Sequence, residues 1–255
     1  MSLVRLIGRL DIQGPTLVKG IQLEGVRQLG SPEVFAEDYY RQHIDEILYM
    51  DVLANLYGRN SLREIVAWTS ERVFVPLTVG GGIRTVEDAI SLFKSGADKV
   101  AVNTAALRRP ELISEIANAT GSQSIVLSIE AKSIGPDRWD AFMENGREKS
   151  GRDVIDWACQ GERLGAGEIL LTSVDKEGTR RGCDLALLKA VSSAVNIPVI
   201  YSGGVGKPGD VVDAIKVGGA SAVAMADILH YKRYSLEDVH QAVRAAGIRV
   251  RPMYE

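Results

Sequence analysis

The sequence has few of the residues that build disulfide frameworks and metal centres. Its two cysteines, Cys159 and Cys183, are too few for such a framework and lack Cys-X-X-Cys spacing. Its three histidines, His43, His230 and His240, stand in no metal-ligand spacing. We therefore expect no metal and no other cofactor.

Long apolar runs and a strong net charge are also absent. No run reaches the 18 apolar residues typical of a membrane-spanning helix, and the sequence has no secretory signal pattern. The 30 basic and 33 acidic residues leave a net charge of −3, which gives no reason to expect nucleic acid or an anionic membrane as a partner. We therefore expect a cytoplasmic protein.

What the sequence does contain is a glycine-rich stretch at residues 75–104. A short β-branched run is followed by three glycines, Gly80–Gly82, then by a helical pattern and a second strand that ends at Asn103 and Thr104. Backbone N–H groups in such turns, at the carboxyl ends of neighbouring strands, suit a phosphate. The simpler alternative is that the glycines only connect strand to helix, because one glycine cluster is a weak signal.

The same pattern occurs a second time, at residues 197–227. Gly81-Gly82 corresponds to Gly203-Gly204 at an offset of 122, and Thr104 corresponds to Asp227 at an offset of 123. A repeat of this length indicates that the chain consists of two related halves.

Each half is predicted to hold four strand-then-helix units, which implies parallel strands with right-handed crossovers. The 255 residues and the two-fold repeat favour one α/β domain, a closed (βα)8 TIM barrel with half-barrels at about residues 1–120 and 121–245. The active site of such a barrel lies at the carboxyl ends of its strands. Those ends carry Asp11, Asp51, Gly81-Gly82, Asn103-Thr104, Glu130, Ser173, Gly203-Gly204 and Asp227.

Three further segments carry predictions about local structure. Residues Ile12–Gly30 are predicted to be a long polar loop, which in a compact domain is more often functional than idle. Residues Ala131–Ser150 are a second long connection, in which Trp139–Phe142 resembles a hairpin strand. Residues Ser61–Arg72 are predicted to form a helix.

Two carboxylates are related by the repeat. Asp11 and Glu130 end the first and fifth strands, which face each other across an eight-stranded barrel. Carboxylates on opposite sides of one ligand suit a general acid and a general base, provided that their surroundings separate their pKa values. The alternative is that they only cap helices or pair with Lys19 or Lys132.

A ring of charges is predicted at the other end of the barrel. Because strand side chains alternate, Arg5 points inward if Asp11 does, and the same count turns Glu46, Lys99 and Glu168 inward at the starts of their strands. Such barrels normally hold branched apolar layers, and buried charge is costly. The ring is therefore either a structural plug or a gate across a passage through the barrel.

These motifs resemble a known family, the cyclase subunits of imidazole glycerol phosphate synthase in histidine biosynthesis. The likeness runs from Arg5 to about Val250. Its anchors are LVKG at Leu17–Gly20, PLTVGGGIR at Pro76–Arg84, GADKVAVNTAA at Gly96–Ala106, GAGEILLTS at Gly165–Ser173 and SGG at Ser202–Gly204.

The resemblance implies a glutamine amidotransferase. A partner glutaminase subunit would dock at the amino-terminal face of the barrel, as a heterodimer, and ammonia would pass through the barrel to the opposite face. There the family converts a phosphoribulosyl-formimino aminoimidazole carboxamide ribonucleotide into imidazole glycerol phosphate and aminoimidazole carboxamide ribonucleotide. The expected substrate is therefore a phosphorylated small molecule.

The resemblance also implies roles for residues at matching positions. It makes Asp11 and Glu130 the catalytic acids, Arg5, Glu46, Lys99 and Glu168 the ammonia gate, and Asp98 a residue that meets the glutaminase. The expected substrate- and phosphate-binding residues are Lys19, Gly82, Asn103, Thr104, Thr172, Gly178, Ser202, Gly204 and Asp227.

Four positions depart from the family pattern. Glu130 and Glu177 stand where the family has Asp, Asp227 stands where it has Ser, and Arg9 stands where it usually has Cys. Arg9 is expected either to block the passage or to pair with Glu130. The carboxylate of Asp227 would repel a phosphate unless it is protonated or neutralised, and the nearby cations in the sequence are Arg180, Arg181 and Lys207.

These departures leave two alternatives to the cyclase. One is a paralogue that delivers ammonia to a different substrate, such as a nucleotide sugar. The other is a non-catalytic barrel that docks and activates a glutaminase. The related isomerase of the same pathway fits less well, because the charge ring and the LVKG motif resemble the cyclase.

Overall fold

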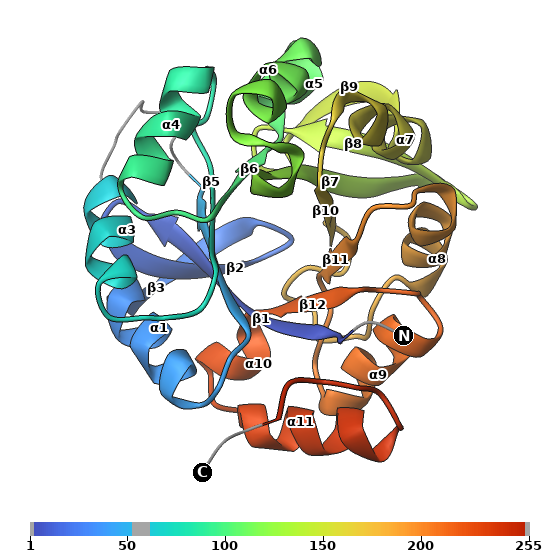
Figure 1. Cartoon of the computed structure of the whole chain (residues 1–255). Coiled ribbons are helices and arrows are strands. Elements are labelled where there is room, and N and C mark those ends of the chain that lie inside the picture. Colours follow the sequence, from blue (N-terminus) through green and yellow to red (C-terminus); the bar gives the residue numbers. More distant parts are fainter. Residues whose placement is uncertain (1–2, 53–61, 253–255) are drawn as a thin grey trace.

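The computed structural model of the chain describes residues 3–52 and 62–252. Eight parallel strands form a closed barrel, with helices around its outside (Figure 1). In barrel order these strands are β1 (Arg5–Gln13), β4 (Glu46–Asp51), β5 (Leu77–Gly80), β6 (Lys99–Val102), β7 (Ile125–Gly135), β10 (Glu168–Ser173), β11 (Val199–Ser202) and β12 (Ala222–Met225). Pairing of β12 with β1 and of β7 with β10 closes the cylinder, so the predicted (βα)8 barrel is confirmed.

The helices lie between the strands along the chain. They are α1 (Pro32–Arg41), α3 (Leu62–Ser70), α4 (Val86–Lys94), α5 (Thr104–Arg108), α6 (Glu111–Thr120), the short 3-10 helix η1 (Ser122–Ser124), α7 (Val154–Leu164), α8 (Leu185–Ala194), α9 (Pro208–Lys216), α10 (Asp227–His230) and α11 (Leu236–Ala245). The helix predicted to begin at Ser61 is described only from Leu62, because Ser61 lies outside the described residues.

The barrel strands bury both faces, because helices cover the outside and side chains fill the inside. Outward residues such as Leu6 and Leu10 join the large core between strands and helices. Inward residues form a separate apolar layer inside the barrel: Ile7, Leu48, Ala101, Val126, Leu170, Ile200, Ala222 and Ala224. This layer lies between the two groups of polar residues at the barrel ends.

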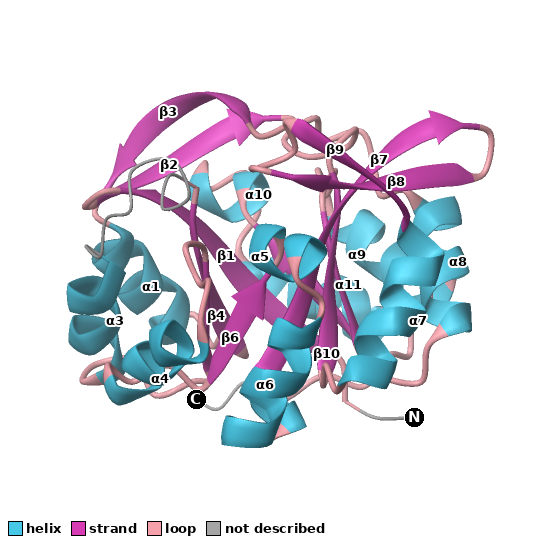
Figure 2. Cartoon of the chain, turned by 90° about the horizontal axis from the view of Figure 1, so that it is seen from above, coloured by secondary structure: helices cyan, strands magenta, loops and turns pink. Residues whose placement is uncertain are grey.

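Two hairpins cover one end of the barrel (Figure 2). The predicted loop at Ile12–Gly30 is wrong, because this segment forms strands β2 (Thr16–Ile21) and β3 (Glu24–Gly30). Strand β1 extends past Asp11 and pairs with β2, so the glycines of this segment lie in a hairpin turn and in strands β2 and β3.

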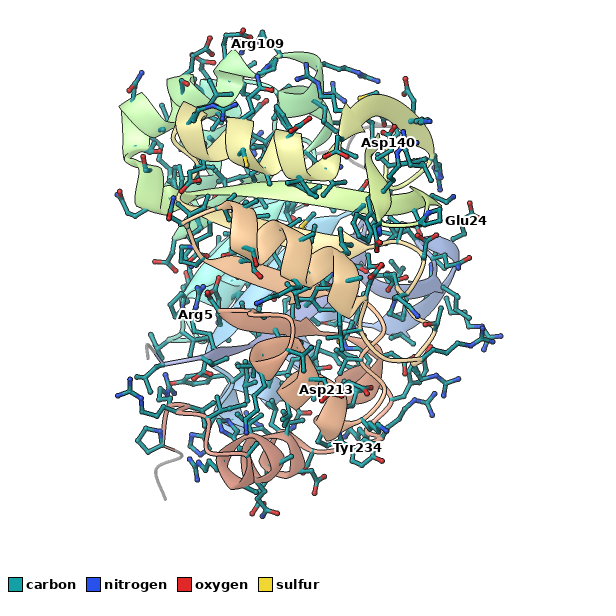
Figure 3. All side chains as sticks on the ribbon, turned by 90° about the vertical axis from the view of Figure 1, so that its right-hand side faces the viewer. Arg5, Glu24, Arg109, Asp140, Asp213 and Tyr234 are labelled. Carbon is teal, nitrogen blue, oxygen red and sulfur yellow. The ribbon has the colours of Figure 1, made fainter. Side chains whose placement is uncertain are left out.

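The second hairpin is formed by the extended β7 with β8 (Arg138–Met143), and β9 (Glu148–Asp153) adds to it. The predicted hairpin strand at Trp139–Phe142 is confirmed. Figure 3 labels Arg5 at one end of the barrel and Glu24 and Asp140, on the two hairpins, at the other.

The starts of helices α4 and α9, which correspond to each other in the sequence repeat, make matching local contacts. Asp88 accepts hydrogen bonds from the backbone N–H groups of Arg84 and Thr85 at the start of α4. Asp210, its counterpart at 122 residues' distance, accepts from those of Gly206 and Lys207 at the start of α9.

Candidate active site

The two carboxylates predicted from the repeat lie at the hairpin end of the barrel. Asp11 is 4% exposed and Glu130 is 6% exposed. Their strands, β1 and β7, are four places apart in the eight-stranded cylinder, so they stand on opposite walls. The Glu130 carboxylate accepts a hydrogen bond from the backbone N–H of Gly146 at 2.7 Å, in the turn between β8 and β9.

Arg9 lies inside the barrel between the apolar layer and the hairpins. Its Nε donates to Asp11 Oδ1 at 2.9 Å, and its Nη1 donates to Thr172 Oγ1 at 2.9 Å and Ser202 Oγ at 3.1 Å. Its hydrogen-bonded ion-pair partner is thus Asp11 and not Glu130, and the hydroxyls of Thr172 and Ser202 both face Arg9. At 3% exposure, the guanidinium ties β1 to β10 and β11 across the barrel.

The surroundings drive the pKa values of the two acids in opposite directions. Burial alone would raise the pKa of Asp11, but the charges of Arg9 and then Lys19 outweigh it, and the pKa is lowered. Burial raises the pKa of Glu130 to about 7, although the N–H of Gly146 and the charge of Arg9 oppose the shift. One acid is therefore ionised near neutral pH and the other is close to half protonated, which is the separation that acid–base work requires.

A cavity of about 50 Å³ adjoins Glu130 on the side of the first glycine turn. It is lined by Gly82, Asn103, Thr104 and Arg147, among others. Gly82 has φ +73°, and the buried Oδ1 of Asn103 has no hydrogen-bond partner among the described residues. The predicted residues of the first phosphate site are thus brought together.

The sequence reasoning missed Arg147 in this cavity. It lies in the turn between β8 and β9, which only the hairpin brings over the barrel.

Gly81 fixes the conformation of the first glycine turn, after β5. A Cβ at this position would lie 2.3 Å from Asp51 O, and the backbone has φ +99°. Any other residue at this position would clash with Asp51 and strain the backbone.

The second glycine turn borders a smaller cavity of about 20 Å³, lined by Gly178, Gly204 and Asp227, among others. The nearest cation to Asp227 is one that the sequence reasoning missed, since Arg233 Nε donates to Asp227 Oδ1 at 2.8 Å. Arg180 Nε lies 3.8 Å from the same oxygen. The predicted neutralisation of this carboxylate therefore comes from Arg233 and Arg180, and the structure places neither Arg181 nor Lys207 in ionic contact with it.

Lys19 reaches this region from strand β2. Its ammonium forms a buried ion pair with Glu177, whose Oε2 also accepts from the backbone N–H of Leu23 at 3.1 Å. Glu177 lies between β10 and α8, so one carboxylate fastens strand β2 and the β2–β3 turn to the loop opposite. The hairpin is thus closed over the second cavity.

The charge ring is formed at the other end of the barrel. Arg5 contacts Glu46 at 2.8 Å and Glu168 at 2.9 Å, and Lys99 contacts the same two carboxylates at 3.3 and 3.1 Å. The predicted inward direction of all four side chains is confirmed. Asp98 is exposed at this end, and its Oδ2 accepts from the backbone N–H of Leu77 at 2.8 Å.

In residues 3–52 and 62–252, no helix has the length and apolar character needed to cross a membrane. The same residues contain no group of three or more His, Cys, Asp or Glu side chains placed to hold a metal ion.

Comparisons with known proteins give matches over most of the chain. The family model described as "Histidine biosynthesis protein" matches residues 5–235. A curated relative from Legionella pneumophila, "Imidazole glycerol phosphate synthase subunit HisF", is 62% identical over 207 residues, which are 81% of this chain and 98% of the relative.

Proposed function

The chain belongs to the histidine biosynthesis protein family, and from this premise we propose that it is the cyclase subunit of an imidazole glycerol phosphate synthase. In this role it uses ammonia to convert the phosphoribulosyl-formimino intermediate into imidazole glycerol phosphate and aminoimidazole carboxamide ribonucleotide. A relative that is 62% identical over nearly its whole length does not favour the two alternatives, a paralogue with another substrate or a non-catalytic barrel.

The observation that carries the proposal is the pair of buried acids with opposite pKa shifts. When ammonia attacks, the incoming nitrogen must lose a proton, and the leaving amine nitrogen must gain one. Asp11, held ionised by Arg9, is suited to accept the first proton. Glu130, with a pKa raised to about 7 by burial, is suited to donate the second.

Arg9 supports this division of roles. A guanidinium 2.9 Å from Asp11 makes protonation of Asp11 unfavourable, so Asp11 is a poor candidate for the acid. Thr172 and Ser202 fix the guanidinium and so act on Asp11 through Arg9. We assign Arg9, Thr172 and Ser202 as positioning residues.

One phosphate end of the substrate is assigned to the cavity beside Glu130. It is lined by Gly82, Asn103, Thr104 and Arg147, among others. The arginine supplies a positive charge, and the unpartnered Asn103 oxygen can accept from a ligand hydroxyl or N–H. This cavity therefore offers groups for both the phosphate and the adjoining sugar.

The partner is proposed to be a glutaminase subunit docked on the end of the barrel that carries the charge ring. Asp98 is exposed there, and Phe74, just before β5, has 72% of its surface exposed. An exposed aromatic side chain beside a polar rim is typical of a protein interface. The ring of Arg5, Glu46, Lys99 and Glu168 then lies between the partner and the apolar layer, where ammonia would enter.

The test is ammonia-dependent turnover by the purified protein. Wild-type protein is expected to consume the phosphoribulosyl-formimino intermediate with ammonium salts alone. Asp11→Asn is expected to reduce the rate by about 10² to 10⁴, the usual contribution of a general base. Glu130→Asp keeps an acid but withdraws it by about 1 Å, for which a loss on the order of 10² is expected.

Glu148→Gln, which removes an exposed carboxylate on β9 of the same hairpin, is the matched control and is expected to retain full activity. Absence of turnover in the wild-type protein and in Glu130→Asp would rule out the proposed reaction.

A further inference from the structure

A large cavity opens at the rim of the barrel, beside the second glycine turn. Its volume is about 500 Å³, and it lies between the β2–β3 hairpin, the loop after β10 and the turn after α10. It shares Lys19, Gly178 and Asp227 with the 20 Å³ inner cavity, so it continues that cavity outward. Glu24, labelled in Figure 3, marks this end of the barrel.

Three arginines from separate segments line the rim cavity: Arg27 on β3, Arg180 in the loop after β10, and Arg233 after α10. Asp227 lies among them and contacts Arg233 and Arg180 through their Nε atoms, at 2.8 and 3.8 Å. The guanidinium of Arg233 also lies 5.2 Å from the ring centre of Tyr231. The fold therefore holds Arg233 in place from two sides.

These guanidiniums keep donors available for a ligand. Within the part of the chain that the structure describes, Arg180 and Arg233 have ionic contacts through Nε only, and Arg27 has no ion-pair partner. Lys19 is already neutralised by Glu177. The three arginines outnumber the two lining carboxylates, Glu24 and Asp227, so the cavity favours an anion.

The inner cavity is poorly suited to the same anion. At about 20 Å³ it has room for about one water molecule. The carboxylate of Asp227 also lies on its wall and would repel a phosphate placed against it. Asp227 also lines the rim cavity, but there Arg233 and Arg180 lie beside its carboxylate and offset its charge.

Clusters of arginines recognise phosphate in particular, because the guanidinium fork matches its oxygens. We propose that the substrate phosphate farther from Glu130 binds in the rim cavity, held by Arg27, Arg180 and Arg233. This inference rests on the proposed function, which requires a substrate with two phosphates. It places the second phosphate site in the rim cavity and not in the inner cavity beside the second glycine turn.

The test uses the double variant Arg27→Gln/Arg180→Gln, since neither residue makes an ionic contact closer than 3.8 Å. Arg181→Gln is the matched control, because Arg181 is adjacent in sequence and does not line the cavity. In ammonia-driven turnover, the double variant is expected to raise the KM for the bisphosphate substrate at least tenfold. The kcat is expected to stay within about threefold, since the contact is made equally in ground and transition states.

A second measurement does not depend on turnover. Titration of each protein with inorganic phosphate, followed by calorimetry, is expected to give two sites in wild type and in Arg181→Gln, and one in the double variant. Unchanged phosphate binding in the double variant overturns the proposal. Lost phosphate binding with an unchanged KM overturns the assignment to the substrate and indicates a separate phosphate ligand. Failure of the proposed function is distinct from both, since it appears as absent wild-type turnover.

Discussion

Replacing Glu130 by Gln should stabilise the protein at and above neutral pH while it removes the catalytic acid. Glu130 is buried, and its pKa is raised from 4.5 to about 7. Glutamine has nearly the same shape, and its amide oxygen can keep the hydrogen bond from the N–H of Gly146. The variant therefore removes a titratable proton with little change in packing.

The sign and size of the change in the free energy of unfolding follow from proton linkage. Below pH 4.5 the side chain is neutral in both the folded and the unfolded state, so its full contribution to stability is present. As the pH rises from 4.5 to 7, the unfolded chain loses this proton while the folded chain keeps it, and the free energy of unfolding falls. At 1.36 kcal/mol per pH unit, the loss amounts to about 3 kcal/mol.

The assay is chemical denaturation of wild type and Glu130→Gln from pH 4 to pH 8. The free energy of unfolding of the variant minus that of wild type is expected to rise by about 3 kcal/mol over this range. The exposed variant Glu148→Gln is expected to give a flat difference. A flat difference for Glu130→Gln as well would refute the reasoning, because it would mean that burial does not disfavour the ionised carboxylate.

Three further outcomes are expected. Arg9→Met leaves the buried Asp11 without its cation, so the free energy of unfolding at pH 8 should fall by about 3 to 5 kcal/mol and turnover should drop, whereas retained stability would contradict the buried ion pair. Lys99→Ala breaks the charge ring and should change glutamine-driven turnover in the assembled enzyme while sparing turnover with added ammonium; equal loss in both assays would contradict a gate. Gly204→Ala places a Cβ about 2.2 Å from Gly182 O at φ +82°, so thermal unfolding should occur at a clearly lower temperature, and an unchanged melting curve would contradict the strain.

The regular part of the fold was predictable from the sequence. The alternation of side chains along β1 was enough to predict that Arg5 points inward, and its contacts in the charge ring agree. The repeat predicted that Asp11 and Glu130 lie on opposite walls of the barrel, because equivalent strands of two half-barrels are related by half a turn about the barrel axis. These predictions needed only periodicity and symmetry, which are local properties of the chain.

The hairpins were harder to predict. Strand β3 is almost entirely solvent-exposed and carries glycine and polar residues, so it lacks the apolar alternation that marks a strand. It is held instead by its pairing with β2, whose turn into β3 is fixed by the long-range contact between Glu177 and the N–H of Leu23. Arg147 and Arg233 were missed as well, since each lies in a turn outside the glycine motifs and reaches its cavity only through the path of that turn.

The position of Arg9 was predictable but its partner was not. The strand period turned it inward, yet its distance to Asp11 or Glu130 depends on side-chain conformation and on the hydroxyls of Thr172 and Ser202. Those contacts join strands that are more than 160 residues apart in sequence. They decide which acid is ionised, and so which one can donate a proton.

The most direct test of the acid–base assignment is the pH dependence of kcat/KM for the phosphoribulosyl-formimino substrate, measured with saturating free ammonia. If Glu130 is the proton donor, kcat/KM should be constant just below pH 7 and should fall about tenfold per pH unit above it, and Glu130→Gln should remove both the activity and this limb. A profile that rises or stays level through pH 7 to 9 would contradict the assignment.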